Sequence, residues 1–72
     1  MFDSVKNDLE NRFTYHAPKE DQPERYDLIR RKALMLAATI SEKCPDSREK
    51  SLAITKLEEA VMWANAAIAR NE

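Results

Sequence analysis

The sequence predicts an all-α protein, an antiparallel helical hairpin preceded by a short N-terminal helical arm. Three observations support this fold class. Glycine is absent from the 72 residues, which disfavours the tight turns that join β-strands. The two longest stretches without proline carry apolar residues at spacings of three and four, the period of an amphipathic helix. The breaks between the helical stretches coincide with proline, which interrupts helices. We expect one domain over residues 1–72, divided into an arm (1–13), a loop (14–22) and two helices (23–43 and 47–71).

The arm places Phe2, Val5, Leu9 and Phe13 at helical spacing, with charged residues between them. A helix of this length is marginal by itself, so it must dock on another part of the protein. We expect Phe13 to be the hydrophobic anchor that pins the arm to the hairpin. The loop that follows should run extended, because Pro18 disfavours a helical conformation at the residue before it.

The first long helix should begin where Asp21 and Glu24, next to a proline, have the form of a capping box. Leu28, Leu34 and Met35 widen its apolar surface beyond a single stripe, which implies a second buried face and therefore a partner. The stripe that faces the other long helix consists of Tyr26, Ile29, Ala33, Leu36, Ala37 and Ile40.

The first long helix should end at Cys44, because the residue before Pro45 resists helical dihedral angles. Asp46 or Ser47 then caps an alanine-rich helix that contains no proline. A connection of about three residues makes the two long helices pack antiparallel. We expect Cys44 to be buried as a small apolar residue. The inward positions of the last helix are Ala53, Leu57, Ala60, Val61, Ala64 and Ile68.

The composition excludes several classes of protein. One cysteine and one histidine form neither an intrachain disulfide nor a four-ligand zinc site, so oligomerisation is the remaining way to stabilise so small a fold. Twelve basic against 13 acidic residues argue against a protein that coats DNA or RNA polymers. No apolar run approaches the roughly 18 residues of a membrane span, and no signal peptide opens the chain, so we expect a cytoplasmic protein.

Catalytic patterns are also missing. Without glycine the chain has no phosphate-binding loop, and the lone His16 has no serine and aspartate at a plausible spacing for a catalytic triad. We therefore expect a binding protein without catalytic residues, cofactor or metal.

Basic residues on the first long helix are candidates for a phosphate clamp, because guanidinium groups match phosphate oxygens with paired donors. An equally open interpretation is a solvated face, in which Glu24 and Asp27 pair with them. The residues are Arg25, Arg30, Arg31 and Lys32.

Three further groups have a functional and a structural interpretation. Tyr15 in the loop can stack on a nucleobase. The start of the last helix, residues 47–51, can attract an anion through its backbone N–H groups, although ordinary capping explains it as well. Trp63 lies outside the inward stripe, which favours a contact across a subunit boundary.

Three segments of the sequence resemble the phage anti-CBASS sponges, whose hairpin domain is shared with the phage anti-Thoeris sponges. They are Phe-Thr-Tyr-His-Ala-Pro (13–18), Gln-Pro-Glu-Arg-Tyr-Asp-Leu-Ile-Arg (22–30) and Ser-Arg-Glu-Lys-Ser-Leu-Ala-Ile-Thr-Lys-Leu-Glu-Glu-Ala-Val-Met-Trp-Ala-Asn-Ala-Ala-Ile-Ala-Arg (47–70). The resemblance covers residues 13–71, and the last segment is its most specific part.

The resemblance implies a homohexamer of hairpins that binds cyclic dinucleotides without cleaving them, and in several members cyclic trinucleotides at separate sites. Such a protein keeps the CBASS effector inactive in the cytoplasm of the infected bacterial host. The dinucleotide pockets would lie between protomers, with an aromatic ring against a base and a basic residue near a phosphate. The matching positions are Tyr15, His16 and Pro18 in the first segment and Arg30 or Arg31 in the second. A second site or an assembly contact would involve Arg48, Lys50, Ser51 and Thr55.

Three alternatives stand beside this hypothesis. A protein of the same fold can bind a cyclic ADP-ribose messenger, as the anti-Thoeris relatives do. A helical interaction protein without a nucleotide ligand would tolerate changes at Tyr15 and Arg30 but not at Leu57 and Val61. A nuclease or phosphodiesterase would need a metal cluster, for which the sequence offers no obvious ligands.

Overall fold

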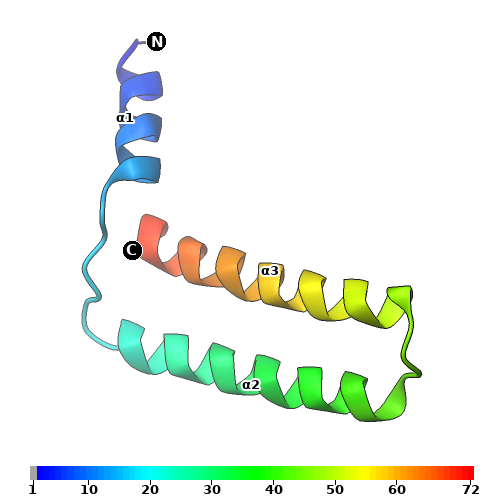
Figure 1. The fold of residues 1–72 in the computed structure, drawn as a ribbon. Helices are drawn as coiled ribbons and strands as arrows, with labels where there is room; N and C mark the ends of the chain where they lie inside the picture. The colour runs from blue at the N-terminus through cyan, green and yellow to red at the C-terminus, as the bar shows by residue number, and fades with distance from the viewer. Residues whose placement is uncertain (1) are drawn as a thin grey trace.

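A computed structural model of the chain describes the backbone of residues 2–72 and the side chains of residues 8–72. Its helices are α1 (Phe2–Phe13), α2 (Gln22–Lys43) and α3 (Arg48–Asn71). Figure 1 shows α2 and α3 side by side and antiparallel, with α1 standing away from them beyond the open end of the hairpin. The predicted all-α class and the hairpin with a short N-terminal helix are confirmed. The molecule is flat and elongated, with extents of 50 × 28 × 14 Å.

The corner between α2 and α3 forms as the sequence indicates. Cys44 has extended dihedral angles (φ −112°, ψ 139°), and its N–H donates to the Ile40 carbonyl over 3.0 Å, which ends α2. Ser47 is the N-cap of α3, since its Oγ accepts from the Lys50 N–H at 3.1 Å. The side chain of Cys44 is exposed, so the expectation that it is buried is wrong. The extended backbone beside Pro45 places this residue at the corner, outside the contact between the helices.

Lys50 connects the two sides of this corner. Its Nζ donates to the Ser41 carbonyl and to Asp46 Oδ1, each over 2.8 Å, and only 15% of its side chain is exposed. A cation near the last carbonyls of α2 is favourable, because those groups carry the negative end of the helix dipole. Lys50 therefore holds the end of α2 against the start of α3.

The beginning of α2 differs from the expected capping box. Asp21 is the N-cap, but its side chain makes no capping hydrogen bond. Its carboxylate instead lies 3.4 Å from Nε of Arg25, a contact that has ion-pair distance without hydrogen-bond geometry. Gln22 Oε1 accepts from the Lys19 N–H at 3.0 Å, which ties the end of the loop to the helix. The local cap is replaced because Arg25, one turn into α2, attracts the Asp21 carboxylate.

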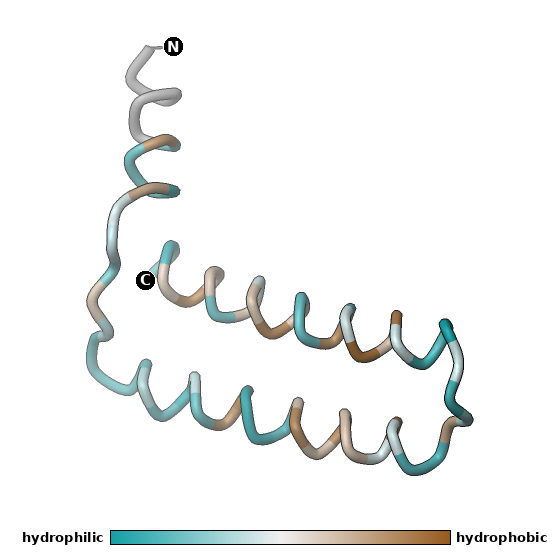
Figure 2. Tube along the Cα trace, viewed as in Figure 1, coloured by the Kyte–Doolittle hydropathy of each residue, from teal (hydrophilic) through white to brown (hydrophobic). Residues whose placement is uncertain are grey.

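The contact between α2 and α3 is a shallow one, and no apolar side chain among residues 8–72 is fully buried. Most predicted inward positions are half-buried, and hydrophobic segments recur at each turn along both helices (Figure 2). Leu36 and Ala60 are exposed but line the groove between α2 and α3, as expected of positions that face the other helix. Ala53 is exposed, and its expected inward position is wrong. The inward stripe of α3 runs through Ile54 instead, because this residue lies one turn before Leu57 on the same face.

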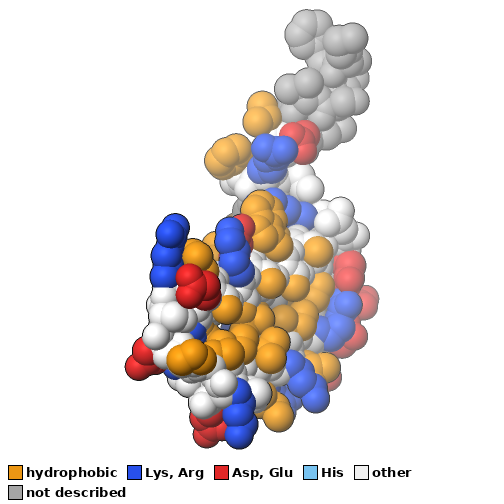
Figure 3. Space-filling model, turned by 90° about the vertical axis from the view of Figure 1, so that its right-hand side faces the viewer, with side chains coloured by type: hydrophobic (Ala, Val, Ile, Leu, Met, Phe, Trp, Pro, Cys, Tyr) orange, Lys and Arg blue, Asp and Glu red, His pale blue; other side chains and the backbone are white. Residues whose placement is uncertain are grey.

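The hairpin also exposes large apolar side chains away from the contact between its helices. Leu34 is 70% exposed, Met62 64% and Trp63 63%. Figure 3 shows hydrophobic side chains gathered over the hairpin, with charged side chains at the margins of that area. Exposed apolar patches of this kind mark surfaces that bind another molecule.

Among the described side chains of the arm, the apolar ones do not pack against the hairpin as expected. Phe13 is 83% exposed and Leu9 50%, so Phe13 is not an anchor within the chain. The expected apolar positions Phe2 and Val5 lie outside the described side chains. The reason for the difference is geometric, because the extended loop leads α1 away from the hairpin before it can lie along it (Figure 1).

Candidate functional site

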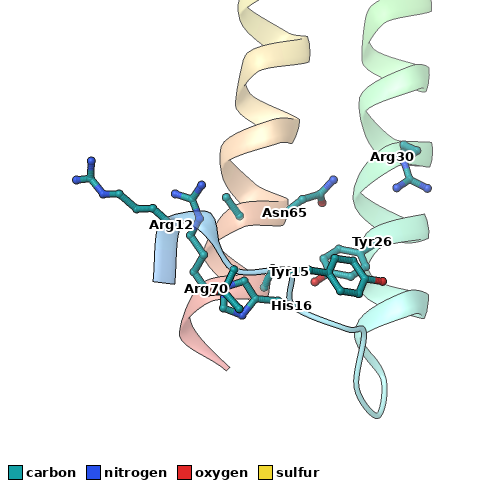
Figure 4. A pocket seen from close by; sticks show the side chains of 10 residues that line it. Arg12, Tyr15, His16, Tyr26, Arg30, Asn65 and Arg70 are labelled. Carbon is teal, nitrogen blue, oxygen red and sulfur yellow. The ribbon is translucent and has the colours of Figure 1, made fainter. Parts of the chain in front are cut away.

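A hollow of about 410 Å³ lies at the open end of the hairpin, where the end of α1, the loop, the first turns of α2 and the last turns of α3 meet. Its volume falls within the range of small-molecule sites, about 300–1,000 Å³. Figure 4 shows the side chains that these four segments contribute to the lining. The lining residues are Arg12, Thr14, Tyr15, His16, Tyr26, Arg30, Asn65, Ala66, Ala69 and Arg70.

The charge of this hollow is positive, because three arginines and no carboxylate line it. Arg30 Nη1 lies 3.4 Å from Asp27 Oδ1, and both side chains are more than 60% exposed. Arg12 Nε lies 3.2 Å from Asp8 Oδ2 at the end of α1. Exposed pairs of this kind contribute about 0–1 kcal/mol each, so an anion can replace either carboxylate at little cost.

Arg70 differs from the other two arginines. It forms no ion pair with any side chain in residues 8–72. In Figure 4 the guanidinium of Arg12 extends away from the other labelled side chains, whereas Arg70 and Arg30 stand on opposite helices of the hairpin. Two guanidinium groups on the two walls suit a ligand that carries more than one phosphate.

Two tyrosine rings lie at the same hollow. Tyr15 comes from the loop and is 83% exposed, whereas Tyr26 belongs to the first turns of α2 and is half-buried. An exposed ring fixed only through its backbone is available to stack on a planar group, and stacking on a base contributes about 1–3 kcal/mol. The loop therefore brings Tyr15 to the hollow that Arg30 also lines.

Asn65 contributes a polar atom that the sequence analysis did not select. Its Oδ1 is buried and has no hydrogen-bond partner among the described residues. A buried acceptor without a partner is costly, so it favours a ligand that donates a hydrogen bond. The signal was present in the sequence: Asn65 follows Val61 by one helical turn and so interrupts the apolar stripe of α3 with an amide.

His16 has a structural contact at the rim of the hollow. Its Nε2 lies 2.8 Å from the carbonyl oxygen of Asn11 and donates to it when protonated, which fastens the loop to the last turn of α1. Pro18 is exposed in the loop and does not line the hollow.

The remaining expected site residues lie elsewhere. Arg31 lines a neighbouring hollow of about 470 Å³ with Asp27, Arg30 and Leu34, so only Arg30 is shared with Tyr15. Lys50 and Ser51 line a hollow of about 410 Å³ beside the corner of the hairpin, at the other end of the molecule. Arg48 and Thr55 are exposed and line neither of the hollows at the two ends. The structure thus brings Tyr15, His16 and Arg30 together at one hollow and Lys50 and Ser51 at another, and the other four expected residues lie outside both.

Beside the main hollow, an ion pair joins the start of α2 to the residue that follows α3. Arg25 Nη1 donates to Glu72 Oε2 over 3.0 Å, and Nη2 donates to Oε1, so the pairing is bidentate. This hydrogen bonding lowers the pKa of Glu72 and raises the pKa of Arg25. At the corner, the hydrogen bond from Lys50 likewise lowers the pKa of Asp46.

No helix in the described chain combines the length and the hydropathy that crossing a bilayer requires. Within the described residues, no group of three or more histidine, cysteine, aspartate or glutamate side chains is placed to hold a metal ion.

Comparison with protein families gives a match over residues 6–69 to the model described as Acb2/Tad1, hairpin domain. Comparison with curated proteins gives no match, and neither does comparison with solved structures. The family match spans α2, the loop and most of α1 and α3, so it includes every residue of the main hollow except Arg70. The chain therefore belongs to the Acb2/Tad1 hairpin domain family, the family of the anti-CBASS and anti-Thoeris sponges.

Proposed function

We propose that the protein is a phage-encoded anti-defence protein that binds and sequesters cyclic oligonucleotide messengers without cleaving them. Cyclic dinucleotides are the main ligands and cyclic trinucleotides a second class. Removal of the messenger keeps the CBASS effector inactive in the cytoplasm of the infected host. The observation that carries the proposal is the hollow at the open end of the hairpin, which combines arginines on both walls, an exposed tyrosine and no carboxylate.

Each part of this hollow matches a part of a cyclic dinucleotide. Arg30 and Arg70 stand on opposite helices, so each can donate paired hydrogen bonds to one of the two phosphates. Tyr15 offers a flat ring to a base. The unpartnered Oδ1 of Asn65 can accept from an exocyclic amine of a base or from a ribose hydroxyl.

A second copy of the chain would complete the site. Within one hairpin Tyr15 is 83% exposed, so at least one face of its ring is free to contact a ligand or another copy of the chain. The apolar surface around Leu34, Met62 and Trp63 is available for packing between copies. We propose that hairpins assemble through this surface into a homo-oligomer, a hexamer by analogy with the family, and that the ligand lies between protomers.

Binding without turnover agrees with the residues at the hollow. None of its side chains is a nucleophile paired with a base, since His16 contacts a backbone carbonyl and no carboxylate lines the hollow. A sponge removes one messenger molecule per site, so its effect depends on affinity and on abundance rather than on catalytic rate.

A cyclic ADP-ribose messenger is the second candidate ligand, because the matching family model covers the anti-Thoeris as well as the anti-CBASS sponges. Such a ligand also carries two phosphates and an adenine base, so the same arginines and the same ring would bind it.

Titration calorimetry with three ligand classes tests the proposal: a cyclic dinucleotide, a cyclic trinucleotide and a cyclic ADP-ribose isomer. We expect submicromolar binding of at least one class, a large loss of affinity in Tyr15→Ala and Arg30→Ala, and no loss in Lys56→Ala. Lys56 is a matched control, because it is a basic residue of α3 that is 73% exposed and lines none of the site. Absence of binding by all three classes would favour a helical interaction protein.

A further inference from the structure

A cluster of polar side chains joins Glu72, the C-cap residue that follows α3, to the base of the loop. Lys19 Nζ donates to the Glu72 carbonyl over 2.9 Å, and the Glu72 carboxylate accepts both donors of the Arg25 guanidinium. Arg25 Nε also lies 3.4 Å from the Asp21 carboxylate. At the open end of the hairpin, Glu72 is therefore held against Arg25 and Lys19, which lie 47 and 53 positions earlier in the sequence.

The base of the loop contains the most buried side chain among residues 8–72. Gln22 is 4% exposed, the one fully buried residue among residues 8–72. The Gln22 N–H donates to the Lys19 carbonyl at 2.8 Å, and the Gln22 Oε1 accepts from the Lys19 N–H at 3.0 Å. Between them, Glu20 has φ 48°, in the left-handed region that a residue with a Cβ adopts at a cost. Such a conformation persists only where the surrounding contacts hold it.

The other end of the loop is fastened to α1 by the contact between His16 and the Asn11 carbonyl. Tyr15 lies next to this contact, and its own ring is 83% exposed, so its side chain does not hold it in place. The position of the ring relative to Arg30 therefore depends on the backbone of residues 14–21, and this backbone is fixed to the hairpin at Lys19 and Gln22.

We infer that Arg25 and Glu72 are positioning residues, whose ion pair fixes the base of the loop and sets the Tyr15 ring at the hollow before a ligand arrives. The effect of the ion pair on ligand affinity rests on the proposed function. Its effect on the order of the loop concerns the free protein and does not depend on a ligand. Ordering the loop in advance lowers the entropy lost on binding, so the ion pair contributes to affinity although neither residue lines the hollow.

Hydrogen–deuterium exchange of the free protein tests the structural part. Glu72→Gln removes the charge and keeps the shape of the side chain. We expect amides of residues 14–25 to exchange at least severalfold faster in this variant, with the centres of α2 and α3 unchanged. Glu59→Gln is the matched control, because Glu59 is in an exposed ion pair with Lys56 on the same helix, at 3.4 Å, and should leave the loop unaffected. Unchanged exchange in Glu72→Gln, or a loop without protection in the wild type, would overturn the inference.

Titration with a cyclic dinucleotide then tests the consequence for binding. We expect roughly tenfold weaker binding by Glu72→Gln and wild-type affinity in Glu59→Gln. Faster loop exchange with unchanged affinity would refute the positioning role. If the wild type binds none of the messengers, the proposed function fails, and the exchange experiment still decides whether the ion pair holds the loop.

Discussion

Replacement of Arg30 by alanine should weaken binding of a cyclic dinucleotide by roughly 30-fold. In the free protein the Arg30 side chain is 64% exposed, and among residues 8–72 its one ion pair is with Asp27 at 3.4 Å, so an incoming phosphate breaks one weak ion pair. A hydrogen bond to a charged group contributes about 1.5–3 kcal/mol, and we take about 2 kcal/mol after the loss of the Asp27 contact. Since about 1.4 kcal/mol corresponds to a factor of ten, the dissociation constant should rise by roughly 30-fold.

Calorimetry at low and high salt measures this effect. The difference between wild type and Arg30→Ala should shrink as salt increases, because Arg30 acts through charge at an exposed position. Arg31→Ala is the control, since Arg31 is the next residue on α2 but lines a neighbouring hollow without Tyr15. A loss in Arg31→Ala equal to that in Arg30→Ala, or a change of less than twofold in Arg30→Ala, would refute the reasoning.

Three further predictions concern stability and assembly. Ser47→Ala removes the side-chain cap of α3 and should lower the free energy of unfolding by about 1 kcal/mol in thermal melts, whereas Ser41→Ala near the end of α2 should cause no comparable loss. Because the pKa values of Asp46 and Glu72 are lowered in the folded protein, both carboxylates stabilise the fold at neutral pH. This stabilisation is lost as the pH falls from the ordinary carboxyl pKa through the lowered pKa of the folded protein, where the carboxylates become protonated. Melts between pH 7 and 3 should show this loss, and Asp46→Asn should reduce it; an equal pH dependence in that variant would contradict the assignment. Leu34→Glu places a charge on a side chain that is 70% exposed in one hairpin, so light scattering should show dissociation of the proposed oligomer with the helical circular dichroism retained; an unchanged mass would place the interface elsewhere.

The hairpin was predictable because its signals are local. Apolar residues at spacings of three and four, the proline at 45 and the serine before α3 indicate where each long helix begins, ends and faces. The exception within α3 has the same origin. Alanine is small enough for the inward stripe and for the exposed flank, so Ala53 was assigned inward although Ile54 occupies that face.

The beginning of α2 was less predictable, because its contacts are not local. Asp21 and Glu24 have the spacing of a capping box, yet Asp21 pairs with Arg25, and Arg25 also binds Glu72, which lies 47 positions away. A sequence pattern does not show which residue from the end of α3 reaches the start of α2. The same limit applies to Phe13, whose exposure depends on the direction of the loop.

The candidate site was predictable in part. Tyr15 and Arg30 were selected by residue type and by resemblance, and the structure places both at one hollow. Arg12, Arg70 and Asn65 were not selected, because arginines at helix ends and an amide in an alanine-rich helix are ordinary in sequence. Only the antiparallel pairing brings the end of α3 beside the start of α2, where these side chains meet Tyr15.

Recovery of intact ligand from the purified complex tests the central claim most directly. Wild-type protein would be incubated with a cyclic dinucleotide, separated from free ligand, denatured, and the released nucleotide identified and quantified by chromatography. The account predicts unmodified cyclic dinucleotide in a fixed ratio to protein, and little or none from Tyr15→Ala. Linear or hydrolysed nucleotide would show an enzyme instead of a sponge, and the absence of bound nucleotide for every messenger class would contradict the proposed function.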